Sequence, residues 1–281
     1  MQMPDAIRPT RRAIEEIALG MAFARADGFI ASYNKSGRTW FRFLLANYLN
    51  AVFDLGLQID FHNVFAVVPN YRLNRQQGWR AYQFGGRAEV PFLAVTHLPY
   101  RPRLFRGRDI LFVVRDPRDV LVSAYFHKTR HAGLFEGPIE AFVRSPEHGV
   151  MDLVGFLNGW SARIGTHRHY VIAYERLKAD PAGHLEDVLN FLRLPVERTA
   201  VEQALAASSF EAMLAIEMKN GHPAHRYDRA DPDSRRVRRG RVGGFRETLE
   251  PGLIAEIEET CARHLSAASK RLLRDTGFAP A

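Results

Sequence analysis

Residues 29–48 read FIASYNKSGRTWFRFLLANY and carry the strongest structural signal in this chain. Residues 29–33 are mostly apolar and follow Gly28, a pattern that predicts a buried strand. A polar loop of residues 34–39 comes next, and apolar side chains then recur at helical spacing from Trp40 to Tyr48. The stretch therefore predicts a strand, a tight loop and a helix in direct succession.

A loop between a strand and a helix favours phosphate, because the first helical N–H groups lack intrahelical partners and the helix dipole adds positive charge. Here Lys35 and Arg38 add full charges to the loop, and Ser36 and Thr39 add hydroxyl donors. Trp40 follows, where its indole can stack on a flat base. The loop lacks the pattern G-x-x-x-x-G-K-[ST] of nucleoside-triphosphate sites, so the predicted phosphate site is of another type. The simpler alternative is an ordinary turn with solvated basic residues.

The composition bounds the class of protein. The chain has 281 residues, of which 46% are hydrophobic and 25% charged, and it fits one large α/β domain. We expect residues 1–28 to form an arm and a helix that pack on a domain of residues 29–281. The net charge of +8 and the pI near 9.9 favour anionic partners such as nucleotides, nucleic acid or membrane surfaces.

The distribution of cysteine and apolar residues predicts the compartment. Cys261 is the single cysteine, which excludes an intrachain disulfide framework and an all-cysteine metal site. No uninterrupted apolar run is long enough to span a bilayer. Glu15, Glu16 and Arg25 interrupt the N-terminal apolar pattern, which is typical of an amphipathic helix and not of a signal peptide. We therefore expect a soluble, cytoplasmic protein without stable membrane insertion.

Three further segments have the pattern of buried strands: residues 92–96, 109–114 and 169–174. They alternate with segments of helical periodicity: residues 13–25, 117–125, 150–164, 181–192, 197–207 and 253–273. This alternation predicts an α/β fold, a single domain with a central, mainly parallel sheet flanked by helices. Residues 219–244 are basic and contain helix breakers, so we expect a long mobile loop there.

Four distinctive groups follow the predicted strands. Ligands of a parallel sheet bind outside the carboxyl ends of its strands. The phosphate loop follows the first strand, His97 the second and Arg115 the third, and Tyr174 ends the fourth. Singly, a histidine is more often structural, and Arg115 also fits an ion pair with Asp116. Their shared position favours one crevice with a phosphate site, a general base and a second cation.

Several motifs occur in order along residues 30–248: NKSGRTW at 34–40, THLP at 96–99, VVRDPRDVLVS at 113–123, Tyr174 with Glu175, SSFEAM at 208–213 and RRGRVGGF at 238–245. Together they resemble the motifs of the cytosolic-type sulfotransferases, which use 3'-phosphoadenosine 5'-phosphosulfate (PAPS). The resemblance implies a P-loop-like sulfotransferase domain, PAPS as donor, adenosine 3',5'-bisphosphate (PAP) as product and no metal.

The resemblance also implies a role for each matching residue. The 5'-phosphosulfate is held by Lys35, Ser36, Gly37, Arg38 and Thr39. The 3'-phosphate is held by Arg115, Ser123, Arg238, Arg239 and Gly240. The adenine is packed by Trp40, Phe210 and Met213 and hydrogen-bonded by Tyr174 and Ser208. His97 is the general base, and Lys35 stabilises charge on the leaving oxygen.

The chain departs from the family pattern at three positions. Val95 stands where family members usually have a lysine two residues before the histidine, so either Lys35 must stabilise more of the leaving-group charge or Arg38 helps. Gly244 and Phe245 replace the late aspartate and tryptophan. The short dimerisation motif of animal members has no match, so the oligomeric state is left open, with a homodimer as one option.

The sequence also predicts the kind of acceptor, and it leaves two alternative classes of function open. The rings between Phe61 and Phe84, with Phe126 and Phe135, predict an apolar pocket for a small-molecule or lipid-like hydroxyl acceptor. A P-loop kinase is the first alternative and would need Mg²⁺ and a lysine in the other register. A basic nucleic-acid-binding protein is the second, suggested by the net charge and residues 235–241. The resemblance instead implies no nucleic-acid partner.

Overall fold

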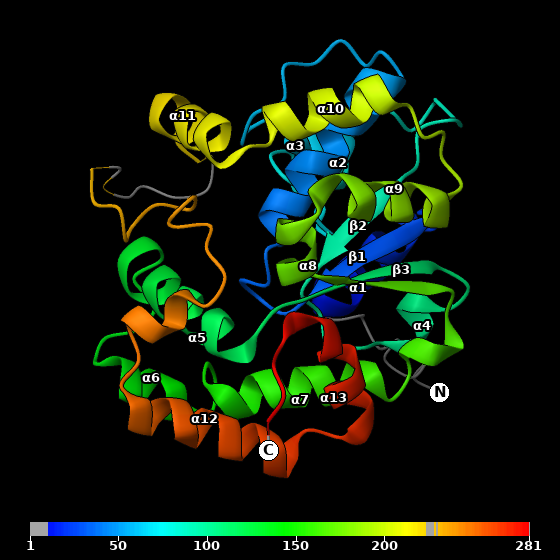
Figure 1. Cartoon of the computed structure of the whole chain (residues 1–281). Coiled ribbons are helices and arrows are strands. Elements are labelled where there is room, and N and C mark those ends of the chain that lie inside the picture. The colour runs from blue at the N-terminus through cyan, green and yellow to red at the C-terminus, as the bar shows by residue number, and fades with distance from the viewer. Residues whose placement is uncertain (1–10, 223–227, 229, 281) are drawn as a thin grey trace, which may run out of the picture.

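The computed structural model describes residues 11–222, 228 and 230–280 (Figure 1). Four parallel strands form the central sheet in the order β2-β1-β3-β4. Their bounds are Gly28–Ser32 for β1, Leu93–Thr96 for β2, Asp109–Val114 for β3 and His169–Ala173 for β4. The predicted α/β fold with a parallel sheet is confirmed, and each predicted strand is present with its bounds shifted by no more than one residue at either end.

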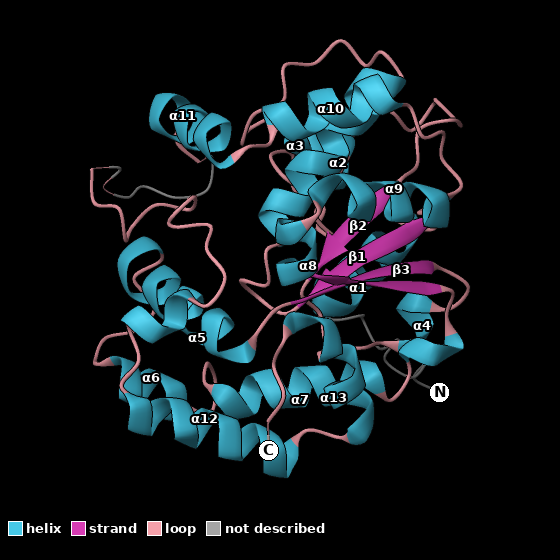
Figure 2. Ribbon diagram, viewed as in Figure 1, coloured by secondary structure: helices cyan, strands magenta, loops and turns pink. Residues whose placement is uncertain are grey.

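Helices cover both faces of this sheet (Figure 2). The helices are α1 Arg11–Ala22, α2 Arg38–Val52, α3 Val64–Val67, α4 Pro102–Phe105, α5 Pro117–Phe126, α6 Ile139–Arg144, α7 Val150–Ser161, α8 Tyr174–Ala179, α9 Pro181–Leu192, α10 Arg198–Ala207, α11 Phe210–Asn220, α12 Pro251–His264 and α13 Ala267–Leu272. Within the described ranges, none of them combines the length and the apolar character that a bilayer crossing requires. The arm expected at the start of residues 1–28 falls mostly outside the described residues.

Each strand contributes side chains to two separate cores. Successive strand residues point to opposite faces, so Phe29 and Phe112 lie in one core and Ile30 and Leu111 lie in the other. The first core is completed by α7 and α12, and the second by α2, α9 and α10. Because both faces are buried, the strands are mostly apolar, and a ligand can reach the sheet at the ends of its strands.

The segment predicted as a mobile loop, residues 219–244, begins within α11, because Lys219 and Asn220 are the last two residues of that helix. Its described residues after Asn220 form turns and irregular structure up to a 3-10 turn at Gly244–Glu247. Buried Glu217 of α11 accepts hydrogen bonds from the backbone N–H groups of Arg236 and Val237, both 2.7 Å long. The carboxylate thereby fixes the path of the chain where the basic run begins. Mobility of the remainder stays a prediction.

Candidate active site

A cavity of about 420 Å³ lies at the carboxyl ends of the strands. Its wall includes residues that follow each of the four strands, together with side chains of α5, α11 and the segment after α11. Fifteen of the sixteen residues predicted for the site line this cavity: Lys35, Gly37, Arg38, Thr39, Trp40, His97, Arg115, Ser123, Tyr174, Ser208, Phe210, Met213, Arg238, Arg239 and Gly240. Ser36 is the exception, because it is buried and is not part of the wall.

The loop between β1 and α2 has a backbone suited to an anion. Lys35 and Gly37 both have positive φ angles, 69° and 94°, which turn the chain sharply before α2 begins. A Cβ atom on Gly37 would lie 2.3 Å from the ring of Tyr174, so only glycine fits between the loop and the end of β4. The open N–H groups of the first helical turn therefore lie at the cavity wall.

Lys35 lies in a strongly cationic environment. Burial lowers its pKa well below the usual range, and three arginines lower it further: Arg236, Arg115 and Arg238. Such crowding of positive charge is unfavourable without a counter-ion. An anion bound between these groups would offset both effects and keep the ammonium charged.

His97 is oriented by the end of β1. Its Nδ1 atom lies 2.8 Å from the backbone oxygen of Ser32, and a carbonyl accepts only from a protonated nitrogen. Nε2 therefore carries the lone pair of the neutral ring. Burial, and then the charge of nearby Arg38, lower the pKa of His97 well below its usual range. The imidazole is thus held in the form that accepts a proton.

Arg115 joins three parts of the cavity wall. Its guanidinium donates to the backbone oxygen of Arg241 at 3.0 Å and lies over the ring of Tyr174, 4.4 Å from its centroid. It also pairs with buried Asp119 at 3.3 Å. Its Nε atom is buried and has no hydrogen-bond partner among the described residues. The arginine therefore keeps donor capacity for a ligand.

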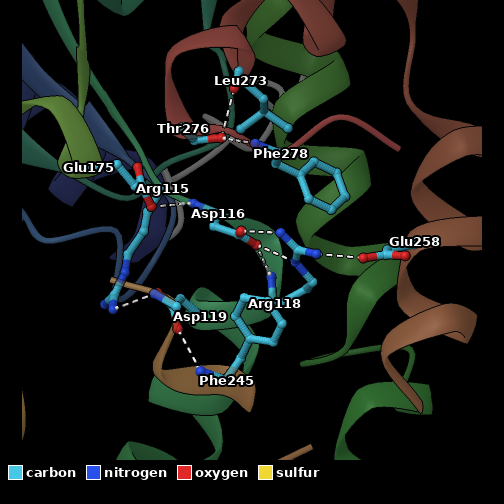
Figure 3. A network of polar contacts seen from close by, with 11 residues as sticks. Arg115, Asp116, Arg118, Asp119, Glu175, Phe245, Glu258, Leu273, Thr276 and Phe278 are labelled. Atoms are coloured by element: carbon cyan, nitrogen blue, oxygen red, sulfur yellow. Dashed lines mark hydrogen bonds and ion pairs between the residues drawn. The ribbon is translucent and has the colours of Figure 1, made fainter. Parts of the chain in front are cut away.

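Asp119 fixes the start of the 3-10 turn at Gly244–Glu247 against α5 (Figure 3). Its carboxylate accepts hydrogen bonds from the backbone N–H groups of Gly243 and Phe245, both 2.9 Å long. Nearby, Arg118 pairs with Asp116 and Glu258 and lies 4.2 Å from the centroid of the Phe245 ring. These contacts bring Arg238, Arg239 and Gly240 to the same cavity as Lys35, His97 and Arg115, which precede them by more than a hundred positions.

One end of the cavity is aromatic. The indole N–H of Trp40 donates to the backbone oxygen of Ser208 at 2.9 Å, and its ring is perpendicular to that of Tyr174. A Cβ atom on Gly240 would lie 2.8 Å from the ring of Phe210, so glycine allows close packing there. The hydroxyl of Ser208 already accepts a hydrogen bond from Asn47 at 3.2 Å. Rings and one hydroxyl thus lie together in the cavity wall, a combination that suits a base.

The structure adds residues that the sequence interpretation missed. Further members of the wall include Asp119, His127, Lys178, Arg236 and Arg241. Arg236 and Arg241 belong to the basic run of residues 235–241, and this run was the feature of the sequence that could have indicated them as site residues. Lys178 lies 5.3 Å from the ring of Trp40, a contact that no spacing in the sequence indicates.

The aromatic rings that were predicted to wall the acceptor pocket are not part of the wall of this cavity. Phe61 packs on Phe43, and Trp79 packs on Phe92, both inside the two cores. Within the described part of the chain, none of the rings between Phe61 and Phe84, nor Phe126 or Phe135, is part of the cavity wall. The aromatic density of this region serves packing. Among the described residues there is also no group of three or more histidine, cysteine or acidic side chains placed to hold a metal ion.

The fold and the cavity define an α/β protein with a phosphate loop, an oriented histidine and a second cationic cluster. The family model described as "Sulfotransferase domain" matches residues 25–269. The chain belongs to this family and is a sulfotransferase, and the kinase and nucleic-acid-binding alternatives are not favoured.

Individual relatives agree with this membership. "Sulfotransferase 1 family member D1" of Rattus norvegicus is 24% identical and covers 86% of this chain and 84% of its own length. "Cytosolic sulfotransferase 17" of Arabidopsis thaliana is 25% identical over 83% of this chain and 72% of its own. A crystal structure of mouse sulfotransferase SULT7A1 complexed with PAP has the same fold, with a TM-score of 0.60, 19% identity, and coverage of 92% of this chain and 94% of that one.

Proposed function

We propose that this sulfotransferase takes its sulfuryl group from PAPS and binds PAP as the product in the cavity at the strand ends. One observation carries the proposal: Lys35, His97 and Arg115, predicted from separate motifs, line a single cavity. PAPS has two separate anionic groups, and the cavity has a basic cluster for each. The PAP complex of the mouse relative supports the same nucleotide.

The donor site follows from the geometry of the two clusters. The loop from Lys35 to Thr39, with the first N–H groups of α2, would hold the 5'-phosphosulfate. Arg115, Ser123, Arg238, Arg239 and Gly240 would hold the 3'-phosphate. The adenine would lie between Trp40, Phe210 and Met213, near Tyr174 and Ser208. Ser36 would act through its backbone N–H, because its side chain is buried and is not part of the cavity wall.

The chemical step needs one base and one cation. The Nε2 atom of His97 accepts the hydroxyl proton as the acceptor oxygen forms a bond to sulfur. The bond from sulfur to the bridging oxygen breaks, and its electron pair stays on the 5'-phosphate, where Lys35 stabilises the added charge. Val95 is buried in β2 and supplies no charge there, so Lys35 with Arg38 would stabilise the leaving group.

Sulfotransferases act on small-molecule acceptors, and a hydroxyl of a small molecule is the acceptor class that we propose here. One relative is named for luciferin, and the fold is shared with a retinol dehydratase crystallised with retinol and PAP, with a TM-score of 0.61, 16% identity, and coverage of 90% of this chain and 82% of that one. The lipid-like part of our expectation depended on rings that pack in the cores. We further propose the cytoplasm as the site of action, by likeness to relatives named cytosolic.

A transfer assay tests the proposed function. The protein is incubated with PAPS carrying radiolabelled sulfate and a panel of phenols, alcohols, sugars and lipids. Labelled acceptor, formed together with PAP in equal amount, supports the proposal. Lack of transfer to the whole panel, together with lack of PAP binding, would contradict it.

A further inference from the structure

Helix α11 carries the side chains assigned to the adenine and a buried carboxylate on the same face. Phe210 and Met213 line the cavity, and Glu217 follows Met213 by one helical turn. Glu217 is 0% exposed. A carboxylate is rarely buried so completely unless it is paired or hydrogen-bonded. The proposed chemical step does not use this carboxylate, so its place in the fold calls for another role.

Glu217 accepts hydrogen bonds from the chain that returns to the cavity after α11. One carboxylate oxygen accepts from the backbone N–H of Arg236 and the other from that of Val237, both at 2.7 Å. Residues 236–241, RVRRGR, all line the cavity, and we call them the arginine segment. The two hydrogen bonds therefore hold the arginine segment at the point where it enters the cavity wall.

The arginine segment lies between α11 and α5 (Figure 1). Gly240 packs so closely on Phe210 that a Cβ atom on this glycine would lie 2.8 Å from the ring. The guanidinium of Arg238 lies over the ring of Phe126, 4.3 Å from its centroid. The segment is thus held to α11 at Glu217 and at Phe210, and to α5 at Phe126. The part of it that is assigned to the 3'-phosphate lies between these contacts.

The ion pairs of these arginines are less suited to fix them than the backbone contacts are. Arg238 pairs with Asp233 at 3.4 Å, and Arg239 pairs with Glu247 at 2.8 Å, but the two carboxylate side chains are 37% and 53% exposed. Exposed pairs contribute little to stability. A binding site whose groups are already ordered loses less entropy when the ligand binds. The buried anchor at Glu217 provides that order.

We propose that Glu217 is a positioning residue for the 3'-phosphate: by holding the start of the arginine segment, it keeps Arg238 and Arg239 in place for that group. The same helix carries the residues assigned to the adenine, so the base and the 3'-phosphate bind to parts of the chain that are fixed to α11. This inference rests on the proposed function of the cavity.

The substitution Glu217→Gln tests the inference. Glutamine has nearly the same size, but its amide offers one acceptor oxygen to two N–H donors. We expect the affinity for PAP to fall by about tenfold or more, and that for adenosine 5'-monophosphate by about threefold or less. Glu217 also opposes the lowering of the Lys35 pKa, but more weakly than three arginines lower it, so the monophosphate should lose little. Calorimetry measures both affinities.

A control and a second background assign the effect. Glu202→Gln is the matched control, because Glu202 is an exposed residue of α10 that pairs with Arg198 and is not part of the cavity wall. Its preference for PAP over the monophosphate should equal that of the wild type. Where Arg238 and Arg239 are both replaced by glutamine, adding Glu217→Gln should not change the preference further. An unchanged preference in the single variant, or a further loss in this background, would overturn the inference.

Hydrogen exchange of the wild type tests the anchor even if Glu217→Gln does not fold. Without nucleotide, the N–H groups of Arg236 and Val237 should exchange at least about tenfold more slowly than in a peptide of the same sequence, because a buried acceptor holds them. Saturating PAP should slow exchange in residues 238–241 more than the saturating monophosphate does. Exchange at the rate of the peptide, or equal effects of the two nucleotides, would overturn the inference.

Failure of this inference can be told apart from failure of the proposed function. A wild type that prefers PAP, with the same preference in Glu217→Gln, leaves the proposed function intact and removes the role of Glu217. A wild type that binds no PAP removes both.

Discussion

His97 has a fixed orientation, and its surroundings favour the neutral form of its ring. The bond from Nδ1 to the backbone of Ser32 leaves Nε2 as the proton acceptor, and burial beside Arg38 favours the neutral ring. We predict that His97→Ala lowers kcat by about 10²- to 10⁴-fold, the range for loss of a general base. PAP affinity should change little, because the imidazole is assigned to the acceptor. Steady-state assays with calorimetry check both; turnover near the wild-type value would remove His97 from this role.

Glu175 is a partly buried carboxyl group with a raised pKa. Burial raises its pKa from 4.5 to about 7, although the backbone N–H of Asp116 donates to one oxygen at 2.9 Å. The folded state therefore binds the proton more tightly than the unfolded state. This contribution to stability is complete below about pH 4.5 and is lost as the pH rises through about 7.

We predict that Glu175→Gln removes this pH dependence. Between about pH 5 and 7.5 the wild type should lose up to about 3 kcal/mol from this group, and the glutamine variant should show a flatter profile. Urea unfolding across this range measures the difference between the two proteins. Parallel profiles for variant and wild type would show that Glu175 is ionised in the folded protein.

At the scale of elements, the turn between β1 and α2 is the most constrained part of the site. Gly37 has a φ of 94°, and a Cβ there would meet the ring of Tyr174 at 2.3 Å. We predict that Gly37→Ala destabilises the fold by about 1–3 kcal/mol and weakens PAP binding, since the loop must move away from β4. Chemical unfolding measures the change in stability, and calorimetry measures the change in PAP affinity.

Gly155→Ala is the matched control for this substitution. Gly155 lies inside α7, and a Cβ there would have open space within 4 Å. This variant should be as stable as the wild type or more so by about 0.5–1 kcal/mol, because alanine favours helix. Equal effects of the two substitutions would contradict the role of the Gly37 turn.

The sequence predicted elements well where local signals were strong. Helix α9 has the predicted bounds, because Asp180 caps it through a hydrogen bond to the N–H of Gly183 and proline begins it. The fourth strand was extended one residue too far, since Tyr174 begins α8. Helix α8 has 6 residues, which is too short for a helical period to show.

The part of the site that could be predicted from the sequence consists of residues that directly follow a strand. Lys35, His97 and Arg115 each follow a strand, and parallel topology then brings them to one edge. The positions of Arg42 and Arg236 were not predictable, because they depend on tertiary contacts. Asn70 meets Arg42 through a bond across 28 positions, and Glu217 reaches Arg236 through one across 19. Contacts between residues so far apart in the sequence do not follow from the periodicity of a helix or a strand.

For the whole molecule, Arg118 connects the last third of the chain to the sheet (Figure 3). It pairs with Asp116 and Glu258 and lies between the rings of Phe245 and Phe278. We predict that Arg118→Met destabilises the fold by about 3–5 kcal/mol, because Asp116 is left buried without its cation. Arg263→Met, which breaks an exposed pair with Glu259, should change stability by about 0.5 kcal/mol or less. Similar unfolding midpoints for both variants would contradict this.

The central claim is that distant basic clusters bind both ends of one nucleotide, and calorimetry of PAP and adenosine 5'-monophosphate tests it most directly. The account predicts that the wild type binds PAP about tenfold or more tightly than the monophosphate, because only PAP carries the 3'-phosphate. Arg115→Ala should lose most of this preference, while its affinity for the monophosphate changes little. An absence of heat with PAP, or equal losses for the two nucleotides in the variant, would contradict the account.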